Sequence, residues 1–213
     1  MLIPCQRLLV LAPHTDDAEL GCGATIARFV EEGVPVHVAA FSTAEESRPP
    51  GSDEGMLKKE FLRAMPALGV EPANLRVYDF PVRKLSYHRQ EVLEELVSLR
   101  TSVNPDMVLV PSGADVHQDH QVLYKEAVRA FKQTTLWGYE LPWNHITFAA
   151  QAFVIVEERH LDRKWRALGE YESQLMLNRL YFQEEFVRSL ARVRGAQVGA
   201  EYAEAFEVVR TRL

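Results

Sequence analysis

The stretch RLLVLAPHTDDAELGCG, residues 7–23, decides the fold of this chain. Its first six residues, 7–12, form a short and nearly continuous apolar run, which is typical of a parallel strand buried on both faces. A polar segment with one histidine and three carboxylates follows, and a helical pattern of apolar residues then occupies residues 21–33. A buried strand, a polar loop and a helix in this order predict the first unit of a doubly wound α/β sheet.

The same alternation continues along the chain. Apolar runs predict further strands at residues 36–42, 75–80, 107–111 and 135–139. Helical patterns lie between them at residues 58–68, 89–103 and 120–131. This order predicts a Rossmann-like, doubly wound and mostly parallel α/β sheet with helices on both faces.

The pattern changes after Pro142. We expect a strand at residues 152–157, helices at 161–175 and 178–195, and a tail at 202–213 that combines a helix end with a strand. We interpret these elements as a C-terminal extension of helices and strand, so that residues 1–213 form a single domain.

Composition excludes several classes of protein. The 24 Lys and Arg residues against 30 Asp and Glu residues give a net charge of −6, and no basic block suggests binding to nucleic acid or to an anionic membrane. Two cysteines cannot build a disulfide framework, and no segment reads as a signal peptide or as a membrane span of about 18 apolar residues. We therefore expect a cytoplasmic protein without nucleic-acid partners or membrane insertion. Its oligomeric state, including a homo-oligomer, stays open.

Two polar clusters follow predicted strands directly. Residues 13–19 come after the first strand, and residues 115–120 come after the strand at 107–111. In open α/β sheets, ligands bind outside the carboxyl ends of the strands, where the winding direction reverses. If these two strands are neighbours, three histidines, four aspartates and one glutamate share one crevice. So many ionisable groups together indicate a site for a metal or a substrate.

The residue types in the clusters favour a metal. His14 and Asp17 are three residues apart in one loop, and His120 approaches from the facing loop. Two imidazoles and one carboxylate are typical of catalytic zinc, but also of non-haem Fe2+. Zinc is thus the first candidate and another divalent metal such as Fe2+ the second.

Three further residues are candidates for catalysis. Asp16, between two ligands, can take a proton from a metal-bound water, whose pKa falls to about 7 on zinc. His117 can stabilise the oxyanion of a tetrahedral intermediate, and we expect it to be protonated. Asp119, or Asp115, can hold His117 in the required tautomer and raise its pKa.

Substrate contacts are harder to predict. Trp143 and its apolar neighbours are candidates for a pocket wall, and Arg48 is a candidate partner for an anionic substituent. Arg48 lies in the segment 45–55, which is rich in Pro, Gly and charge and fits either a solvated loop or a mobile lid. Among the other histidines, we expect His37 in the core and His88, His145 and His160 at the surface.

Three other functions remain open at this point. An iron oxygenase can use the same ligands, but it has no need of an adjacent base such as Asp16. A nucleotide-binding module is disfavoured because residues 21–26 lack the third glycine of the dinucleotide motif and follow three acidic residues. A purely structural or scavenging metal site requires a fourth protein ligand.

The two clusters also resemble a known family. HTDDAELGCG at residues 14–23 and HQDH at 117–120 are similar to the two signature motifs of the PIG-L/LmbE-like deacetylase superfamily. The similarity extends to residues 104–106, 139–140, 164–174 and 203–206. Thr15 and Gln118 stand where the family usually has proline, which puts the rigidity of both loops in doubt but removes no ligand.

This resemblance implies an activity. It implies a Zn2+ site of His14, Asp17 and His120, with Asp16 as general base and His117 stabilising the intermediate. The reaction it implies is removal of an acetyl group from a small N-acetylated amino sugar or sugar conjugate. The sequence does not distinguish N-acetylglucosamine conjugates, other glycosides, chitooligosaccharides and thiol-cofactor precursors as substrates.

Overall fold

The strands form one sheet in the computed structural model, which describes residues 5–212. Within these residues the order is β3-β2-β1-β4-β5-β7-β6. The bounds are β1 Leu8–His14, β2 Val36–Ser42, β3 Leu75–Val77, β4 Met107–Pro111, β5 Thr135–Tyr139, β6 Ala152–Val156 and β7 Tyr202–Arg210. The first five strands are parallel, whereas β7 is antiparallel to both β5 and β6. The predicted Rossmann-like α/β fold is confirmed.

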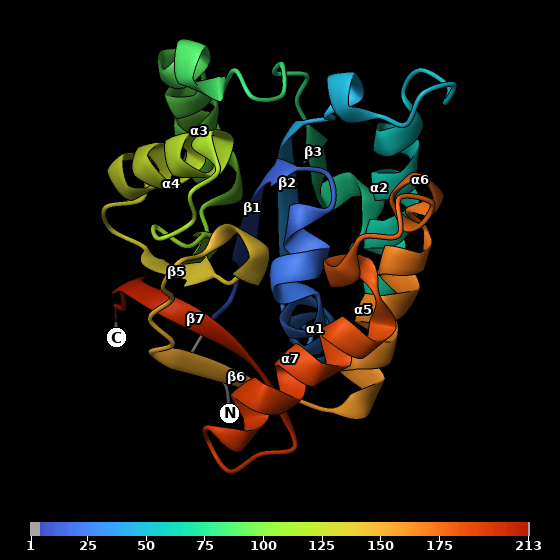
Figure 1. Cartoon of the computed structure of the whole chain (residues 1–213). Helices are drawn as coiled ribbons and strands as arrows, with labels where there is room; N and C mark the ends of the chain where they lie inside the picture. The colour runs from blue at the N-terminus through green and yellow to red at the C-terminus, as the bar shows by residue number, and fades with distance from the viewer. Residues whose placement is uncertain (1–4, 213) are drawn as a thin grey trace.

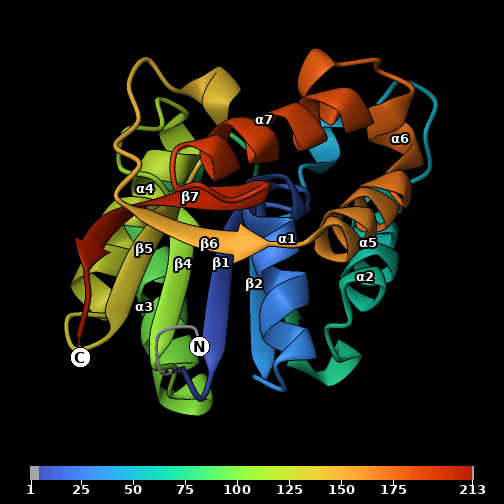
Figure 2. The same ribbon diagram turned by 90° about the horizontal axis from the view of Figure 1, so that it is seen from below.

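Helices cover both faces of the sheet (Figures 1 and 2). One face carries α1 (Asp17–Glu31), α2 (Met56–Leu68), α5 (Glu158–Gly169) and α7 (Glu184–Ala196), with the short α6 (Glu172–Leu175) beyond them. The other face carries α3 (Arg89–Val103) and α4 (Gln118–Ala130). Side chains of β1 alternate between these two cores, as the two-residue period of a strand requires: Leu8 and Val10 belong to the first, Leu9 and Leu11 to the second.

The neighbours of β1 decide where the site lies. β1 pairs with β2 on one side and with β4 on the other, with Leu9 opposite Val108. The winding therefore reverses between β1 and β4, and the two strands end at the same edge of the sheet. The prediction that these two strands are adjacent is confirmed, and it brings the two polar clusters together.

Helix boundaries differ from the predicted ones where polar residues open a helix. α1 begins at Asp17 and α4 at Gln118, earlier than the apolar stripes suggested. Acidic side chains in the first turn of α1 favour the helix dipole, and the His117 side chain caps α4. The predicted helix at 178–195 begins only at Glu184, after a tight turn at residues 178–183. Up to residue 212, the last one described, the tail contains no helix end, since β7 is extended from Tyr202 to Arg210.

Some single-residue predictions also need correction. His160, expected at the surface, is 2% exposed, and its Nδ1 accepts a hydrogen bond from the Glu157 backbone N–H at 3.0 Å. His37, expected in the core, is only half-buried on β2. His145 is half-buried as well, and its Nε2 accepts a hydrogen bond from the Leu141 N–H. Between residues 5 and 212, no helix combines the length and apolar character needed to cross a membrane.

Candidate metal centre

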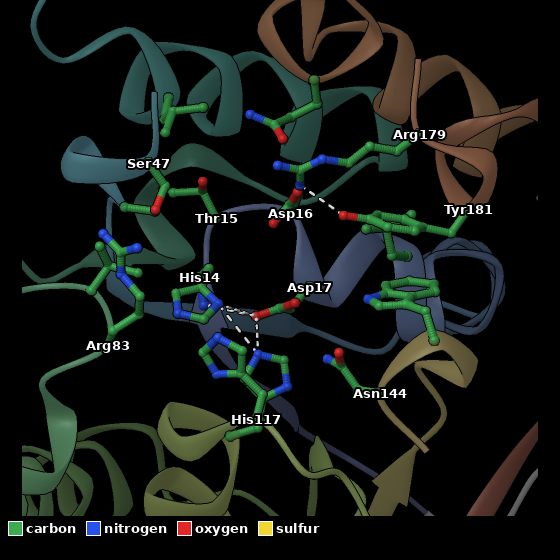
Figure 3. A pocket seen from close by; sticks show the side chains of 17 residues that line it. His14, Thr15, Asp16, Asp17, Ser47, Arg83, His117, Asn144, Arg179 and Tyr181 are labelled. Carbon is green, nitrogen blue, oxygen red and sulfur yellow. Dashed lines mark hydrogen bonds and ion pairs between the residues drawn. The ribbon is translucent and has the colours of Figure 1, made fainter. Parts of the chain in front are cut away.

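A cavity of about 270 Å³ opens at the carboxyl ends of β1 and β4 (Figure 3). Its floor is made by His14, Asp16, Asp17, His117 and His120, which come from the last residue of β1 and from the N-caps and first turns of α1 and α4. The structure thus brings the predicted ligands and the predicted base to one place. Its walls come from segments far apart in the sequence.

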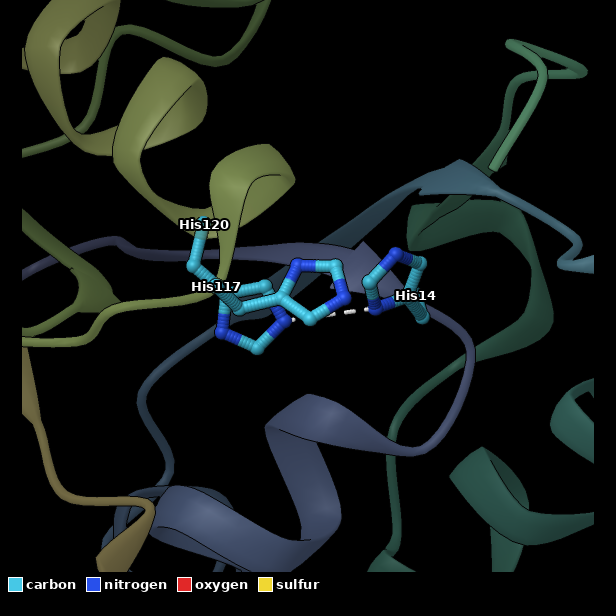
Figure 4. Close-up of side chains that lie close together, drawn as sticks. All are labelled: His14, His117 and His120. Atoms are coloured by element: carbon cyan, nitrogen blue, oxygen red, sulfur yellow. Dashed lines mark hydrogen bonds between the residues drawn. The ribbon is translucent and has the colours of Figure 1, made fainter. Parts of the chain in front are cut away.

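Three floor atoms form a compact triangle. Asp17 Oδ2 lies 3.1 Å from His14 Nδ1 and 3.3 Å from His120 Nε2, and these two nitrogens are 3.3 Å apart (Figure 4). Two bonds of about 2.0–2.1 Å that meet at a tetrahedral angle span about 3.3 Å, so the triangle has the size of one face of a tetrahedral zinc site. The donor set therefore fits a divalent metal with one open position.

Protonation of these groups reflects their crowding. Burial lowers the pKa of His14, but Asp17 and Asp119 outweigh it and raise that pKa to about 9. For His120, burial is likewise outweighed by Asp17 and Asp115, which raise its pKa to about 10. Burial would raise the pKa of Asp17, yet His120 and His14 hold it well below its usual range. A metal at this place would displace protons from the imidazoles.

A carboxylate supports each ligand imidazole from behind. Asp115 Oδ2 lies 2.7 Å from His120 Nδ1, and Asp119 Oδ2 lies 3.0 Å from His14 Nε2. Both carboxylates are fully buried. Such partners fix the orientation and the tautomer of metal-binding histidines. The predicted role of Asp119 is therefore wrong in one respect: its carboxylate holds His14 rather than His117.

His117 is set up as a hydrogen-bond donor. It caps α4, and its Nδ1 accepts the Asp119 backbone N–H at 3.2 Å, which leaves the ring proton on Nε2. Burial and the neighbouring His120 and His14 lower its pKa to about 4. The expectation of a protonated His117 is therefore wrong, since the neutral ring is the stable form near pH 7. One ring nitrogen from each of His14, His117 and His120 lies within 4.8 Å of the other two, which makes His117 an alternative ligand.

Asp16 occupies the N-cap position of α1, but its carboxylate makes no capping hydrogen bond and faces the cavity (Figure 3). Burial and the adjacent Asp17 raise its pKa to about 6, although His14 opposes the shift. A carboxylate with a pKa near the working pH is suited to take up and return a proton.

The wall of the cavity includes residues that sequence reasoning missed. Trp143, predicted as a wall residue, lines the cavity and stacks on Tyr181 with ring centroids 4.0 Å apart. Arg179 donates to the Tyr181 hydroxyl at 2.7 Å, and Arg83 lines the opposite side (Figure 3). Arg83 has a φ of +64°, which is uncommon outside glycine and frequent at functional sites. No motif marks these residues, because they lie on separate loops.

Arg48 does not belong to this cavity. Its guanidinium pairs with Glu45 at 2.9 Å, and it borders a separate shallow depression formed by residues 45–52. Within residues 45–52, Ser47 is the one residue that lines the cavity. The arginines that line the cavity are Arg83 and Arg179 instead.

The sheet order and the polar cluster at its switch point define a Rossmann-like α/β protein with a polar crevice between β1 and β4. The chain belongs to the PIG-L family: the family model described as GlcNAc-PI de-N-acetylase matches residues 9–131. This chain is 26% identical to the diacetylchitobiose deacetylase of Thermococcus kodakarensis over a gapped alignment of 226 positions, which covers 96% of this chain and 83% of that protein.

Solved structures share the whole fold. The conserved protein TT1542 of Thermus thermophilus superposes with a TM-score of 0.80 at 27% identity, covering 97% of this chain and 95% of that one. The 4-carboxy-2-hydroxymuconate hydratase GalB of Pseudomonas putida gives a TM-score of 0.79 at 21% identity, with 98% of each chain covered. A hydratase therefore shares the architecture, so the reaction must be argued from the residues of the site.

Proposed function

We propose that this protein is a metal-dependent hydrolase that removes the acetyl group from the nitrogen of an N-acetylated amino sugar or sugar conjugate. The observation that carries the proposal is the triangle of His14 Nδ1, Asp17 Oδ2 and His120 Nε2, with the Asp16 carboxylate beside it. Family membership supports the same activity, as does the likeness to a diacetylchitobiose deacetylase.

His14, Asp17 and His120 would hold the metal, for which Zn2+ is the first candidate and Fe2+ the second. His117 is the weaker candidate for the third ligand, because its Nδ1 is occupied by a backbone N–H and its Nε2 carries the proton. A bound divalent metal would lower the pKa of a water and polarise the amide carbonyl.

The protein's own residues then move the protons. Asp16 accepts a proton from the attacking water and returns it to the amine nitrogen as the C–N bond breaks. The His117 Nε2–H donates a hydrogen bond to the carbonyl oxygen as negative charge develops there. The products are acetate and a free amine. A neutral His117 serves this role, since donation requires only the Nε2–H.

The rival functions fit the site less well. An iron oxygenase has no use for a carboxylate base with a pKa of about 6 beside the ligands. A nucleotide phosphate would meet Asp16 and Asp17 at the start of α1, where like charges repel it. A purely structural metal would have a fourth protein ligand and no cavity above it.

The walls suggest the kind of substrate. The stacked Trp143 and Tyr181 offer apolar surface to a sugar ring, and the cavity volume suits a small molecule. Arg83 and Arg179 take the place that the sequence analysis gave to Arg48, as contacts for an anionic substituent.

Release of free amine from a panel of N-acetylated sugars tests this function. The protein is assayed after chelation and after addition of Zn2+ or Fe2+ separately, beside the variant His88→Ala, whose side chain lies outside the cavity. We expect activity to disappear on chelation and to return with metal in both proteins. Amine release that continues in the fully chelated protein would exclude the metal-dependent mechanism.

A further inference from the structure

Helix α1 is interrupted in its middle. Cys22 has φ −147° and ψ 26°, outside the helical region, although the helix continues on both sides of it. In a regular helix the Ala24 N–H would pair with the Leu20 carbonyl. Here Ala24 N donates to Glu204 Oε1 at 3.2 Å, and the Leu20 carbonyl accepts from Lys164 Nζ at 2.8 Å. The side chains of Glu204 and Lys164 thus replace the two backbone partners of one helical hydrogen bond.

These two side chains also bind each other. Lys164 Nζ lies 2.7 Å from Glu204 Oε1, and the side chains are only 5% and 6% exposed. The second oxygen of Glu204 accepts the Thr25 N–H at 2.7 Å, which caps the part of α1 that follows the interruption. A buried ion pair is expensive to desolvate and is weak evidence for a role in stability alone. The other contacts of this pair are with backbone groups of α1 at residues 20, 24 and 25, so the pair bears on the path of that helix.

Glycines and an aromatic ring complete the junction. A Cβ at position 23 would lie 2.9 Å from Lys164 Cγ, so Gly23 lets the lysine cross the helix. A Cβ at position 21 would lie 2.2 Å from the Tyr139 ring, whose hydroxyl donates to the Leu11 carbonyl on β1. The first part of α1 is therefore pressed directly against the central strands.

That first part is the turn that carries the candidate catalytic carboxylates. Asp16 and Asp17 open it, and the Leu20 N–H closes it on the Asp16 carbonyl at 3.1 Å. Lys164 holds the same residue, Leu20, by its carbonyl. Lys164 on α5 thus contacts this turn directly, and Glu204 on β7 binds both Lys164 and the start of the next part of α1.

We propose that the Lys164–Glu204 pair is a positioning element for the turn of residues 16–20. Because the pair binds the Leu20 carbonyl and the Ala24 N–H, it fixes the direction of this turn. That direction then sets the distances from Asp17 to His14 and His120. Lys164 and Glu204 both lie beyond residues 9–131, the part that the family model matches. The C-terminal extension therefore builds the site as well as covering the sheet.

The double variant Lys164→Met/Glu204→Leu tests this inference. It leaves no unpaired buried charge, and the freed Leu20 carbonyl and Ala24 N–H can pair with each other, so we expect it to fold with a continuous α1. Zinc affinity, measured against a competing chelator without substrate, should fall by about 10–100-fold, the usual effect of losing a partner that orients ligands. On the best substrate found, kcat should fall while KM changes less than about twofold.

The control is an ion pair on the opposite face of the sheet, in which one partner is buried and the Arg89 side chain is 54% exposed. Glu126 on α4 is fully buried and accepts from Arg89 Nε at 2.8 Å. Arg89→Met/Glu126→Leu also removes a buried carboxylate and should leave zinc affinity unchanged, whatever its melting temperature. If the Lys164/Glu204 variant also keeps wild-type zinc affinity below its melting temperature, the pair is only structural and the inference is wrong.

This inference rests on the proposed function, but the two fail differently. A protein that releases no amine from any substrate would contradict the proposed hydrolysis. The zinc measurement would still decide whether the pair positions the metal ligands, because it needs no substrate.

Discussion

The floor of the cavity and its rim, the part of the wall formed by Arg83 and Arg179, are built in different ways. On the floor, His14 ends β1 and His120 follows the adjacent parallel strand β4, and each imidazole is supported by a fully buried aspartate. On the rim, Arg83 and Arg179 are exposed and come from loops. The sheet sets the geometry of the floor, whereas the side chains of the rim can be replaced without moving the floor residues. We expect the floor to fix the reaction and the rim to select the substrate.

Removing a floor ligand should have the largest effect. His120→Ala deletes one corner of the donor triangle, so bound zinc and amine release should both fall to the level of the chelated protein. Metal content by mass spectrometry and activity are measured on the same samples, with His88→Ala as control. Full zinc occupancy in the His120 variant, or in the equivalent His14 and Asp17 variants, would break the assignment of the floor.

Asp16→Asn separates chemistry from metal binding. An amide cannot accept a proton at neutral pH, so kcat should fall by roughly 10²–10⁴-fold while zinc stays bound. Because the base must be ionised and the pKa of Asp16 is raised to about 6, wild-type activity should decline as the pH falls below about 6. The variant should lack this acidic limb. Loss of zinc instead would mean that Asp16 and Asp17 exchange roles.

His117→Ala asks whether the third imidazole is a donor or a ligand. If His117 donates to the developing oxyanion, the alanine variant should lose about 10²–10³-fold in kcat and keep its zinc. The matched variant His117→Gln keeps an N–H donor of similar reach and should recover part of the loss. Zinc depletion in both variants would instead place His117 among the ligands, in keeping with the proximity of the three rings.

The buried aspartates behind the ligands should matter less than the ligands. Asp115→Asn keeps an acceptor 2.7 Å from His120 Nδ1 but removes its charge, so zinc affinity should weaken by about 10–100-fold. Asp119→Asn should act in the same way through His14. Competition with a chelator measures both. An unchanged affinity would show that the backbone alone orients the imidazoles.

The floor was predictable from sequence because its residues adjoin strands. A strand period and a switch-point rule were enough to bring His14 and His120 together. The side chains behind them were harder: Asp119 was assigned to His117, two residues away, but its carboxylate reaches back to His14 from the first turn of α4. Sequence distance does not show which way a side chain turns within one helical turn.

The rim could not be predicted for a different reason. Arg83 and Arg179 are 96 residues apart (179 − 83), on loops with no periodic pattern, and only the tertiary fold brings them to one cavity. Arg48 was chosen because its segment looked like a loop near a pocket, but Glu45 pairs with it outside the cavity. Likewise, nothing in the motifs revealed that Lys164 and Glu204 interrupt α1.

Rim variants should have the smallest effects, and they test the comparison most directly. Arg179 is exposed, so its contact with an anionic substituent is screened by solvent and worth about 0.2–1 kcal/mol. Arg179→Gln should therefore raise KM for an anionic conjugate by about 1.4- to fivefold, and leave kcat and the KM for a neutral N-acetylated sugar unchanged. Added salt should reduce the difference, because exposed charges are screened. Arg48→Gln, outside the cavity, is the matched control. If Arg179→Gln lowers kcat equally for both substrates, the guanidinium acts on the neighbouring Asp16 rather than on the substrate, and the division between floor and rim fails at this residue.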